Sequence, residues 1–407
     1  MGKTILCPYC FETFDNTEVM VQCDNYATRT VDGKPQEICA RETNTLFNEH
    51  WDTQVMSKHV FNPSIGWLDK IRGYKPKACQ CDMCGATTSR FVCPHCNNWL
   101  PTEMIEKGSE IISVIGGPAS GKSNYIVTLI HQLQKYGYKL QLGQILPQLV
   151  GRNKAEYTRN LYEKAKDSIF KDHIPVAKTA TTEHPIPWIF RLESHATKKA
   201  VYLVFYDTAG ESFKDPEEIR RNAKYLEKSR AVIVLLDTLS IPHIQKILEC
   251  KNIVNQDHAT QFSETMDALN NFATDNTQLY KRPFAFVMSK FDSVIQNQED
   301  LEFDVSPFKH DSSFIQTGKL SLREIGESSE SIKSYLERWD EGQLSFDIVN
   351  RWGDNACFFG VSALGTMTNE NLQINISDDQ QVKPFRVMDP LVWVLHKLGG
   401  FGIPVEE

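Results

Sequence analysis

The sequence has 407 residues and a formal net charge of −8 at pH 7. A chain of this length can form two or three domains and bury a hydrophobic core without disulfides. The acidic balance argues against a protein that mainly coats nucleic acid, because such proteins carry a basic excess. The start lacks a signal peptide's apolar core, and the longest apolar runs, such as Ala231–Leu236, are too short to span a bilayer. We therefore expect a cytoplasmic protein without a membrane segment.

The cysteines are concentrated near the amino end, where nine of the eleven precede residue 100. Reduced cysteines in a cytoplasmic protein bind metal more often than they form disulfides. Two Cys-x2-Cys turns, eight residues apart, predict a zinc ribbon with a four-thiolate shell. Its ligands are expected to be Cys81, Cys84, Cys93 and Cys96. A second, looser set predicts another zinc site at Cys7, Cys10, Cys23 and Cys39.

The second set leaves alternatives open, because its last two cysteines do not form a Cys-x2-Cys turn. His50 or His59 could replace one of them, and Cys39 could be a buried free thiol. Cys79 could compete with Cys81 in the ribbon. A full shell of four ligands leaves no position for a substrate, so both sites are predicted to stabilise the folding of small modules.

The two remaining cysteines, Cys250 and Cys357, are expected in the core.

A phosphate-binding loop follows the apolar run Ile111–Ile115 and reads Gly-Gly-Pro-Ala-Ser-Gly-Lys-Ser. A helix with a buried face, marked by Ile126, Leu129, Ile130 and Leu133, comes next, so the loop has the strand and helix that this motif requires. Backbone N–H groups would surround the phosphates, the lysine would reach the β- and γ-phosphates, and the last serine would bind Mg²⁺. The predicted contacts are Gly116, Pro118, Ala119, Ser120, Gly121, Lys122, Ser123 and Asn124.

Further strand-like runs alternate with helical segments, which predicts an α/β fold with a mostly parallel sheet flanked by helices. These runs are Ala200–Tyr206, Ala231–Leu236, Phe284–Met288 and Ala356–Val361. Asp207, at the end of the first run, is placed to hold Mg²⁺ through water, and the backbone of Gly210 to sense the γ-phosphate.

In this order the elements resemble the G1, G3, G4 and G5 boxes of the TRAFAC-class GTPases, over about residues 109–400. The resemblance implies that Asp292 accepts hydrogen bonds from guanine N1–H and the exocyclic amine, and that the Lys290 stem packs over the base. It implies that the Ala363 backbone meets guanine O6. Ser289 stands where the family usually has Asn or Thr. The implied base-binding residues are Ser289, Lys290, Asp292, Ser362, Ala363 and Leu364.

Switch I and the hydrolytic residue are less clearly marked. Thr179, Thr181 and Thr182 precede a strand-like run, and we favour Thr182 as a Mg²⁺ ligand, with ordinary loop threonines as the alternative. Glu211 stands where Ras-like members carry the glutamine that orients the attacking water. A carboxylate there adds negative charge near the γ-phosphate. We therefore expect GTP hydrolysis to be slow without a partner, with Lys122, Thr182 and Glu211 as the residues that act on it.

Two segments elaborate this core. Residues 293–355 exceed what a minimal G domain needs between its last two boxes, which predicts a helical insertion. The helical stripe within it, formed by Ile332, Tyr335, Leu336 and Trp339, indicates core packing or a partner-binding face. Asp389–Leu398 is predicted to be an amphipathic closing helix that stops at Gly399. The expected organisation is a zinc module at 1–60, a zinc ribbon at 61–104 and a GTPase domain at 105–407.

The zinc knuckles, the phosphate-binding loop, the Asp-Thr-Ala-Gly-Glu run at 207–211 and the closing helix together resemble the double-GTPase family of bacterial conflict systems. This implies a GTP/GDP-dependent switch with Mg²⁺ and two Zn²⁺, which works with companion proteins in defence against phage. Two alternatives remain: a zinc-ribbon protein that binds nucleic acid under control of the G domain, and an ATPase on the same core.

Overall fold

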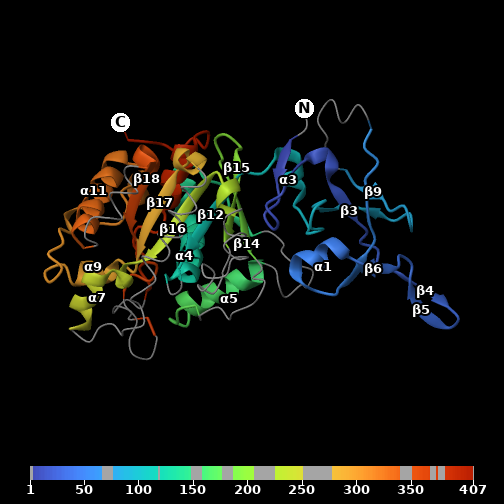
Figure 1. The fold of residues 1–407 in the computed structure, drawn as a ribbon, viewed down its shortest axis with the longest axis horizontal. Coiled ribbons are helices and arrows are strands. Elements are labelled where there is room, and N and C mark those ends of the chain that lie inside the picture. The colour runs from blue at the N-terminus through green and yellow to red at the C-terminus, as the bar shows by residue number, and fades with distance from the viewer. Residues whose placement is uncertain are drawn as a thin grey trace. The chain divides into compact units, whose positions relative to one another are not determined.

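The computed structural model describes residues 3–66, 77–117, 120–147, 158–176, 187–205, 225–250, 277–339, 351–366, 373–374 and 381–406. The chain divides into two compact units (Figure 1). The first contains residues 1–111 and 148–157, and the second contains residues 112–147 and 158–407. Each unit has its own strands and helices and is treated by itself below.

The first unit is built from short antiparallel pairings around the central strand β3 (Met20–Gln22), which lies between β11 (Arg90–Val92) and β8 (Val60–Phe61). Because β3 pairs with β11, the segments 1–60 and 61–104 share one sheet and do not form separate modules. The other elements are β1 (Thr4–Leu6), β2 (Thr13–Asp15), β6 (Arg41–Thr43), α1 (Thr45–Trp51), β7 (Met56–Lys58), β9 (Cys79–Gln80), β10 (Thr87–Thr88) and α3 (Thr102–Lys107).

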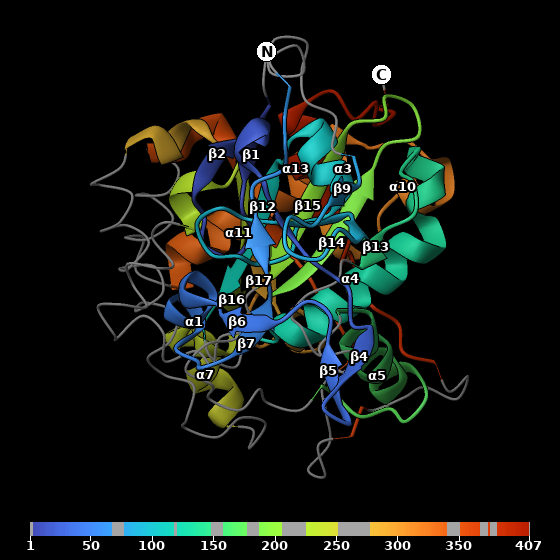
Figure 2. The same cartoon turned by 90° about the vertical axis from the view of Figure 1, so that its right-hand side faces the viewer.

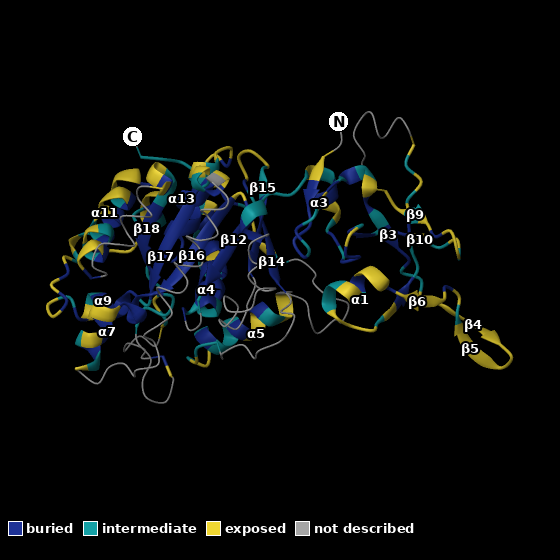
Figure 3. Cartoon of the chain, viewed as in Figure 1, coloured by how far each residue is buried: buried dark blue, intermediate teal, exposed yellow. Residues whose placement is uncertain are grey.

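A hairpin of β4 (Thr28–Val31) and β5 (Lys34–Glu37) extends from this unit, and nearly every residue in it is exposed (Figure 3). Its two-residue turn, Asp32 and Gly33, has positive φ at both positions, 49° and 73°. This is the turn geometry that matches the twist of paired strands, and Asp-Gly is the residue pair that adopts it most readily.

The second unit contains a seven-stranded sheet with the order β13-β14-β15-β12-β16-β17-β18. The strands from β12 to β18 in this order pair in parallel, whereas β13, β14 and β15 pair antiparallel. The bounds are β12 (Ile111–Gly116), β13 (Leu146–Pro147), β14 (Trp188–Glu193), β15 (Ala200–Phe205), β16 (Ala231–Asp237), β17 (Phe284–Ser289) and β18 (Ala356–Gly360). The expected α/β fold with a mostly parallel sheet is confirmed.

Helices cover both faces of this sheet, and Figure 2 shows α7 and α11 on the side opposite α4 and α5. One buried cluster joins α4 and α13 to alternate residues of two strands, including Ile112, Val114, Ile233 and Leu235. This alternation places the cluster on a single face. The helices are α4 (Lys122–Tyr136), α5 (Thr158–Phe170), α7 (Pro242–Glu249), α9 (Asp292–Gln296), α10 (Phe314–Thr317), α11 (Leu322–Trp339) and α13 (Asp389–Leu398).

The helical segment expected after Asp292 and the expected closing helix are both present. In α11, Ile332, Leu336 and Trp339 are buried, so this stripe packs in the core. The closing helix α13 is buried along most of its length and is therefore less amphipathic than predicted; it ends at Gly399, as expected. Cys357 is buried, but Cys250 is exposed at the end of α7, so its predicted place in the core was wrong. No helix in the described ranges is both long and apolar enough to cross a membrane.

Candidate functional site

The phosphate-binding loop begins where β12 ends at Gly116, a position that excludes any side chain. A Cβ atom there would lie 2.6 Å from Ser120 Oγ and 3.0 Å from Leu235. Gly121 adopts the left-handed conformation, with φ 75° and ψ 20°, directly before α4. Ser120 is buried, and its hydroxyl has no hydrogen-bond partner within the described part of the chain. A tight backbone cradle with an unsatisfied polar group fits a bound phosphate.

The first turn of α4 holds the remaining residues of this motif. Lys122 is buried at the helix start, and Ser123 follows it. The Asn124 side-chain oxygen accepts a hydrogen bond of 2.9 Å from the backbone N–H of Val176, which ties this turn to the segment before β14. The helix N-terminus adds partial positive charge, which favours an anion. Pro118 and Ala119, which were also predicted to contact phosphate, lie outside the described residues.

The predicted base-binding residues meet at the end of β17. Asp292 begins α9 and is 7% exposed, and Ser362 Oγ donates a hydrogen bond of 2.5 Å to its Oδ1. The same hydroxyl accepts a hydrogen bond from the Gly365 backbone at 2.9 Å. Burial raises the pKa of the Asp292 carboxyl, whereas the hydrogen bond from Ser362 lowers it. Ala363 and Leu364 follow on the same loop and are half-buried.

Lys290 is held by a residue that the sequence analysis did not single out. Its Nζ lies 2.8 Å from Oδ2 of Asp237, a buried carboxylate that ends β16. Ser289 Oγ donates to the Leu236 carbonyl at 3.0 Å, and Thr238 donates to the Ser289 carbonyl. The sequence did contain a signal for this contact. Asp237 ends a buried strand, and that strand lies beside the one that precedes the G4-like residues.

The residues predicted around the γ-phosphate and Mg²⁺ lie outside the described residues. These are Thr179, Thr181, Thr182, Asp207, Gly210 and Glu211. Their roles remain predictions. Ser123 is the predicted Mg²⁺ ligand that the structure does place, in the first turn of α4.

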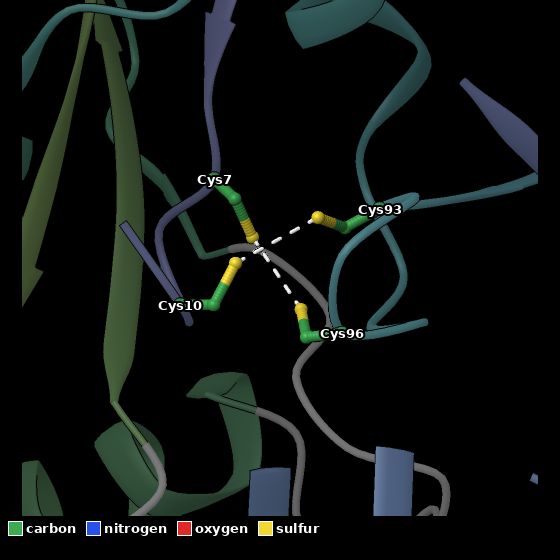
Figure 4. A group of neighbouring side chains, drawn as sticks. All are labelled: Cys7, Cys10, Cys93 and Cys96. Atoms are coloured by element: carbon green, nitrogen blue, oxygen red, sulfur yellow. Dashed lines mark hydrogen bonds between the residues drawn. The ribbon is translucent and has the colours of Figure 1, made fainter. Parts of the chain in front are cut away.

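The eight expected zinc ligands form two groups of four, but the predicted grouping was wrong. One group contains Cys7, Cys10, Cys93 and Cys96 (Figure 4), and the other contains Cys23, Cys39, Cys81 and Cys84. Within each group all sulfur atoms lie within 4.8 Å of one another. The outer pairs of the sequence thus share one site and the inner pairs share the other.

The antiparallel pairing of β3 with β11 explains this nested arrangement. Its register sets Met20 opposite Val92 and Gln22 opposite Arg90. Cys93 therefore leaves β11 beside the start of β3, and Cys23 leaves β3 beside the start of β11. Cys23 and Cys93 thus lie at opposite ends of the paired strands, and each is grouped with cysteines that are distant from it in the sequence.

Both groups fit zinc, because four thiolates at mutual contact distance make a tetrahedral sulfur shell. Burial raises the pKa of the Cys7 thiol, so a bound cation would be needed to hold this sulfur as a thiolate. In the inner group, the Asn25 backbone N–H donates to Cys23 at 3.4 Å and its side chain to Cys84 at 3.7 Å.

The alternative ligands have other contacts. His59 bonds to Glu42 and to Asp82, each at 2.8 Å, and the His50 ring packs against Trp51. Cys79 donates to the Lys77 carbonyl at 3.2 Å and belongs to neither group. Cys39, which could have been a free thiol, is instead a member of the inner group.

The model of the Double-GTPase 2 family matches residues 110–339, which are 230 of the 407 residues. The chain belongs to this family. The match begins just before the phosphate-binding loop and includes the G4 box around Asp292, while the first unit lies almost wholly outside it. The resemblance of this chain to a double-GTPase is thereby confirmed.

This double-GTPase is also similar to a candidate ESX-1 scaffolding and assembly protein, SaeC, of Mycolicibacterium smegmatis. The two are 24% identical over 333 residues, which cover 77% of this chain and 80% of SaeC. The similarity therefore spans most of both chains.

Solved GTPase structures show fainter likeness. They include the elongation factor SelB of Methanococcus maripaludis with a GTP analogue, at 12% identity and a TM-score of 0.24, covering 63% of this chain and 30% of SelB. The S. cerevisiae Ski7 GTPase-like domain bound to GTP has 12% identity and a TM-score of 0.28, covering 72% and 50%. The chain spans half or less of these structures, and such TM-scores carry no argument about its function.

Proposed function

We propose that this double-GTPase binds GTP with Mg²⁺ and acts as a slowly hydrolysing switch. The observation that carries the proposal is the buried Asp292 carboxylate held by Ser362, on the same sheet edge as the phosphate loop. Strands β12, β16, β17 and β18 are parallel, so their carboxyl ends share one edge. At that edge lie Gly116, Asp237, Ser289 and Gly360. Phosphate and base can thus be bound by loops of one rigid sheet.

Base selection follows from the chemistry of the carboxylate. Guanine offers two donors, N1–H and the exocyclic amine, to a group that can accept two hydrogen bonds. Adenine offers no N1–H and lacks that amine, so it would leave the buried carboxylate without either of its two hydrogen bonds to the base. Ser362 occupies one side of Oδ1 and fixes the orientation of the carboxyl group.

Magnesium would be held by Ser123 together with Thr182 and Asp207, and it would neutralise charge on the β- and γ-phosphates. Lys122 would reach the same oxygens. Glu211 would stand near the attacking water, where a second negative charge opposes the transition state. We expect the isolated chain to hydrolyse GTP slowly and Glu211→Gln to hydrolyse it faster. Equal or lower turnover by that variant would rule out the inhibitory role of Glu211.

The cysteine-rich unit is proposed to bind two Zn²⁺ and to contact companion proteins. Six large hydrophobic side chains are exposed on its described part: Tyr26, Val31, Ile38, Leu46, Met56 and Met83. Where such side chains gather into one contiguous patch, they mark a surface that contacts other proteins. SaeC carries the name of a scaffolding and assembly protein, which supports a role in a multi-component system. A role in bacterial defence is a narrower form of this proposal and rests on the family resemblance alone.

The decisive experiment tests whether one substitution changes the preferred base from guanine to xanthine. Xanthine carries a carbonyl where guanine carries its exocyclic amine, so an amide at position 292 can donate to it. Asp292→Asn should lose affinity for GTP and gain affinity for XTP, each by at least about tenfold. Lys122→Ala is the control, because it should weaken both nucleotides together. A wild-type protein that binds ATP as tightly as GTP would overturn the proposal.

A further inference from the structure

We infer that Arg386 is a positioning residue, which makes guanine recognition depend on the inserted segment between β17 and β18. The inference rests on the proposed function, because it concerns how the base-binding carboxylate is held. Among the described residues, Arg386 has no direct contact with the predicted nucleotide-binding side chains. It acts on them through its neighbour Phe385.

The Arg386 guanidinium is buried, with its side chain 4% exposed. It donates to the carbonyls of Pro307 and His310 at 2.9 and 3.2 Å, and to Ser328 Oγ at 2.8 Å. It also forms an ion pair of 2.6 Å with Glu324. These partners come from η7 (Ser306–Phe308), the segment after it and α11. The planar guanidinium group of Arg386 therefore connects separate parts of the inserted segment.

The backbone around Arg386 is also fixed. Its N–H donates to Asp311 Oδ1 at 2.9 Å, and its φ is 50°, a conformation that residues other than glycine seldom adopt. A strained backbone of this kind persists only where surrounding contacts enforce it. The Arg386 guanidinium supplies those contacts. Replacing Arg386 should therefore allow the backbone at residues 385–386 to move.

Phe385 passes this constraint to the base-binding loop. Its N–H donates to the Ser362 carbonyl at 2.8 Å, and its carbonyl accepts from the Ser362 N–H at 3.1 Å. Both backbone groups of Ser362 are thus held by the residue next to Arg386. Ser362 in turn donates its hydroxyl to Asp292. One path from the insertion to the carboxylate therefore runs through the paired backbones of Phe385 and Ser362.

A second set of contacts also links Arg386 to the base-binding residues. The Arg386 guanidinium lies 5.5 Å from the ring centroid of Phe308, which packs 4.9 Å from that of Phe291. Phe291 precedes Asp292 and fills the space that a side chain at Gly360 would need. The insertion therefore supports the base site from both of its loops, through Phe291 and through Ser362.

The test compares GTP with ITP, because inosine lacks only the exocyclic amine that Asp292 is proposed to bind. Wild-type protein should prefer GTP by at least about tenfold, the value of one hydrogen bond to a charged group. In Arg386→Gln this ratio should fall at least about fivefold, while ITP affinity changes less than about threefold. Ser328→Ala removes one hydrogen-bond partner of the Arg386 guanidinium and should also lower the GTP:ITP affinity ratio, by a smaller factor.

Arg282→Gln is the matched control. Arg282 also clasps backbone carbonyls, those of Leu226, Glu227 and Ser229, but it lies before β17, away from the base edge. Its loss should lower thermal stability and leave the GTP:ITP ratio unchanged. If Arg386→Gln and Ser328→Ala keep the wild-type ratio, or weaken both nucleotides equally, Arg386 is only a structural residue. If wild-type protein does not distinguish GTP from ITP, the proposed guanine contact itself fails.

Discussion

Lys290 and Asp237 form an ion pair across the ends of two parallel strands, with Nζ 2.8 Å from Oδ2. The Asp237 side chain is 2% exposed, and its other oxygen caps the turn that follows by accepting the Leu239 N–H at 3.0 Å. Lys290 has a φ of 54°, in the left-handed region that residues other than glycine seldom adopt. The pair fixes the direction of the lysine stem that is proposed to cover the base.

This relationship predicts a uniform loss of affinity in Asp237→Asn. The amide keeps the cap but removes the charge that orients Lys290, so GTP and GDP should both bind about five- to tenfold more weakly. The preference for GTP over ITP should stay within about twofold of wild type, because Asp292 is not held by Asp237. Titration calorimetry with the three nucleotides measures these values. A collapse of the guanine preference would show that the two acidic residues act together.

Gly116→Ala should abolish tight nucleotide binding. The new methyl group would meet Ser120 Oγ and Leu235, and the loop could relieve that contact only by opening the phosphate cradle. We expect GTP affinity to fall by at least about tenfold. Gly326→Ala is the matched control, since Gly326 lies on an exposed face of α11 with no atom within 4 Å of an added Cβ. It should keep its affinity and gain about 0.5–1 kcal/mol in the free energy of unfolding.

The nested metal sites make a prediction about zinc content. Wild-type protein should hold two zinc ions per chain. Serine at Cys7, Cys10, Cys93 and Cys96 should remove one ion and leave an intact four-thiolate site, visible in its cobalt-substituted spectrum. Serine at Cys7, Cys10, Cys23 and Cys39 takes half of each shell and should remove both. One tightly bound ion in the second variant would instead support the sequential grouping.

Asp389 should make stability fall with rising pH. Burial raises the pKa of this carboxyl to about 7, despite the neighbouring Arg386. The native state then keeps a proton that the unfolded chain has lost above about pH 4, so the free energy of unfolding decreases from pH 5 to 7, by about 2 kcal/mol from this group. Asp389→Asn lacks this titration. Urea unfolding at the two pH values should show a smaller decrease in the variant, and an equal decrease would contradict the assignment.

Much of the fold could be read from local pattern. Apolar β-branched runs predicted β12 and β16 to within a residue, and Gly399 marked the end of α13, because strand and helix propensities act over a few neighbouring residues. The phosphate-binding motif was equally local, since its eight residues, 116–123, are consecutive in the sequence. Lys290 and Asp292, directly after a strand-like run, resemble the G4 box, and this resemblance marked Asp292 as the proposed base-binding carboxylate.

Only the tertiary structure decided which distant residues meet. The register of β3 against β11 grouped the cysteines by strand ends and not by sequence order. Asp237 became a partner of Lys290 because parallel strands bring their carboxyl ends together, and Arg386 reached the insertion through backbone carbonyls that no side-chain pattern records. Sequence fixes the chemistry that each segment carries, whereas long-range packing sets the distances on which binding depends.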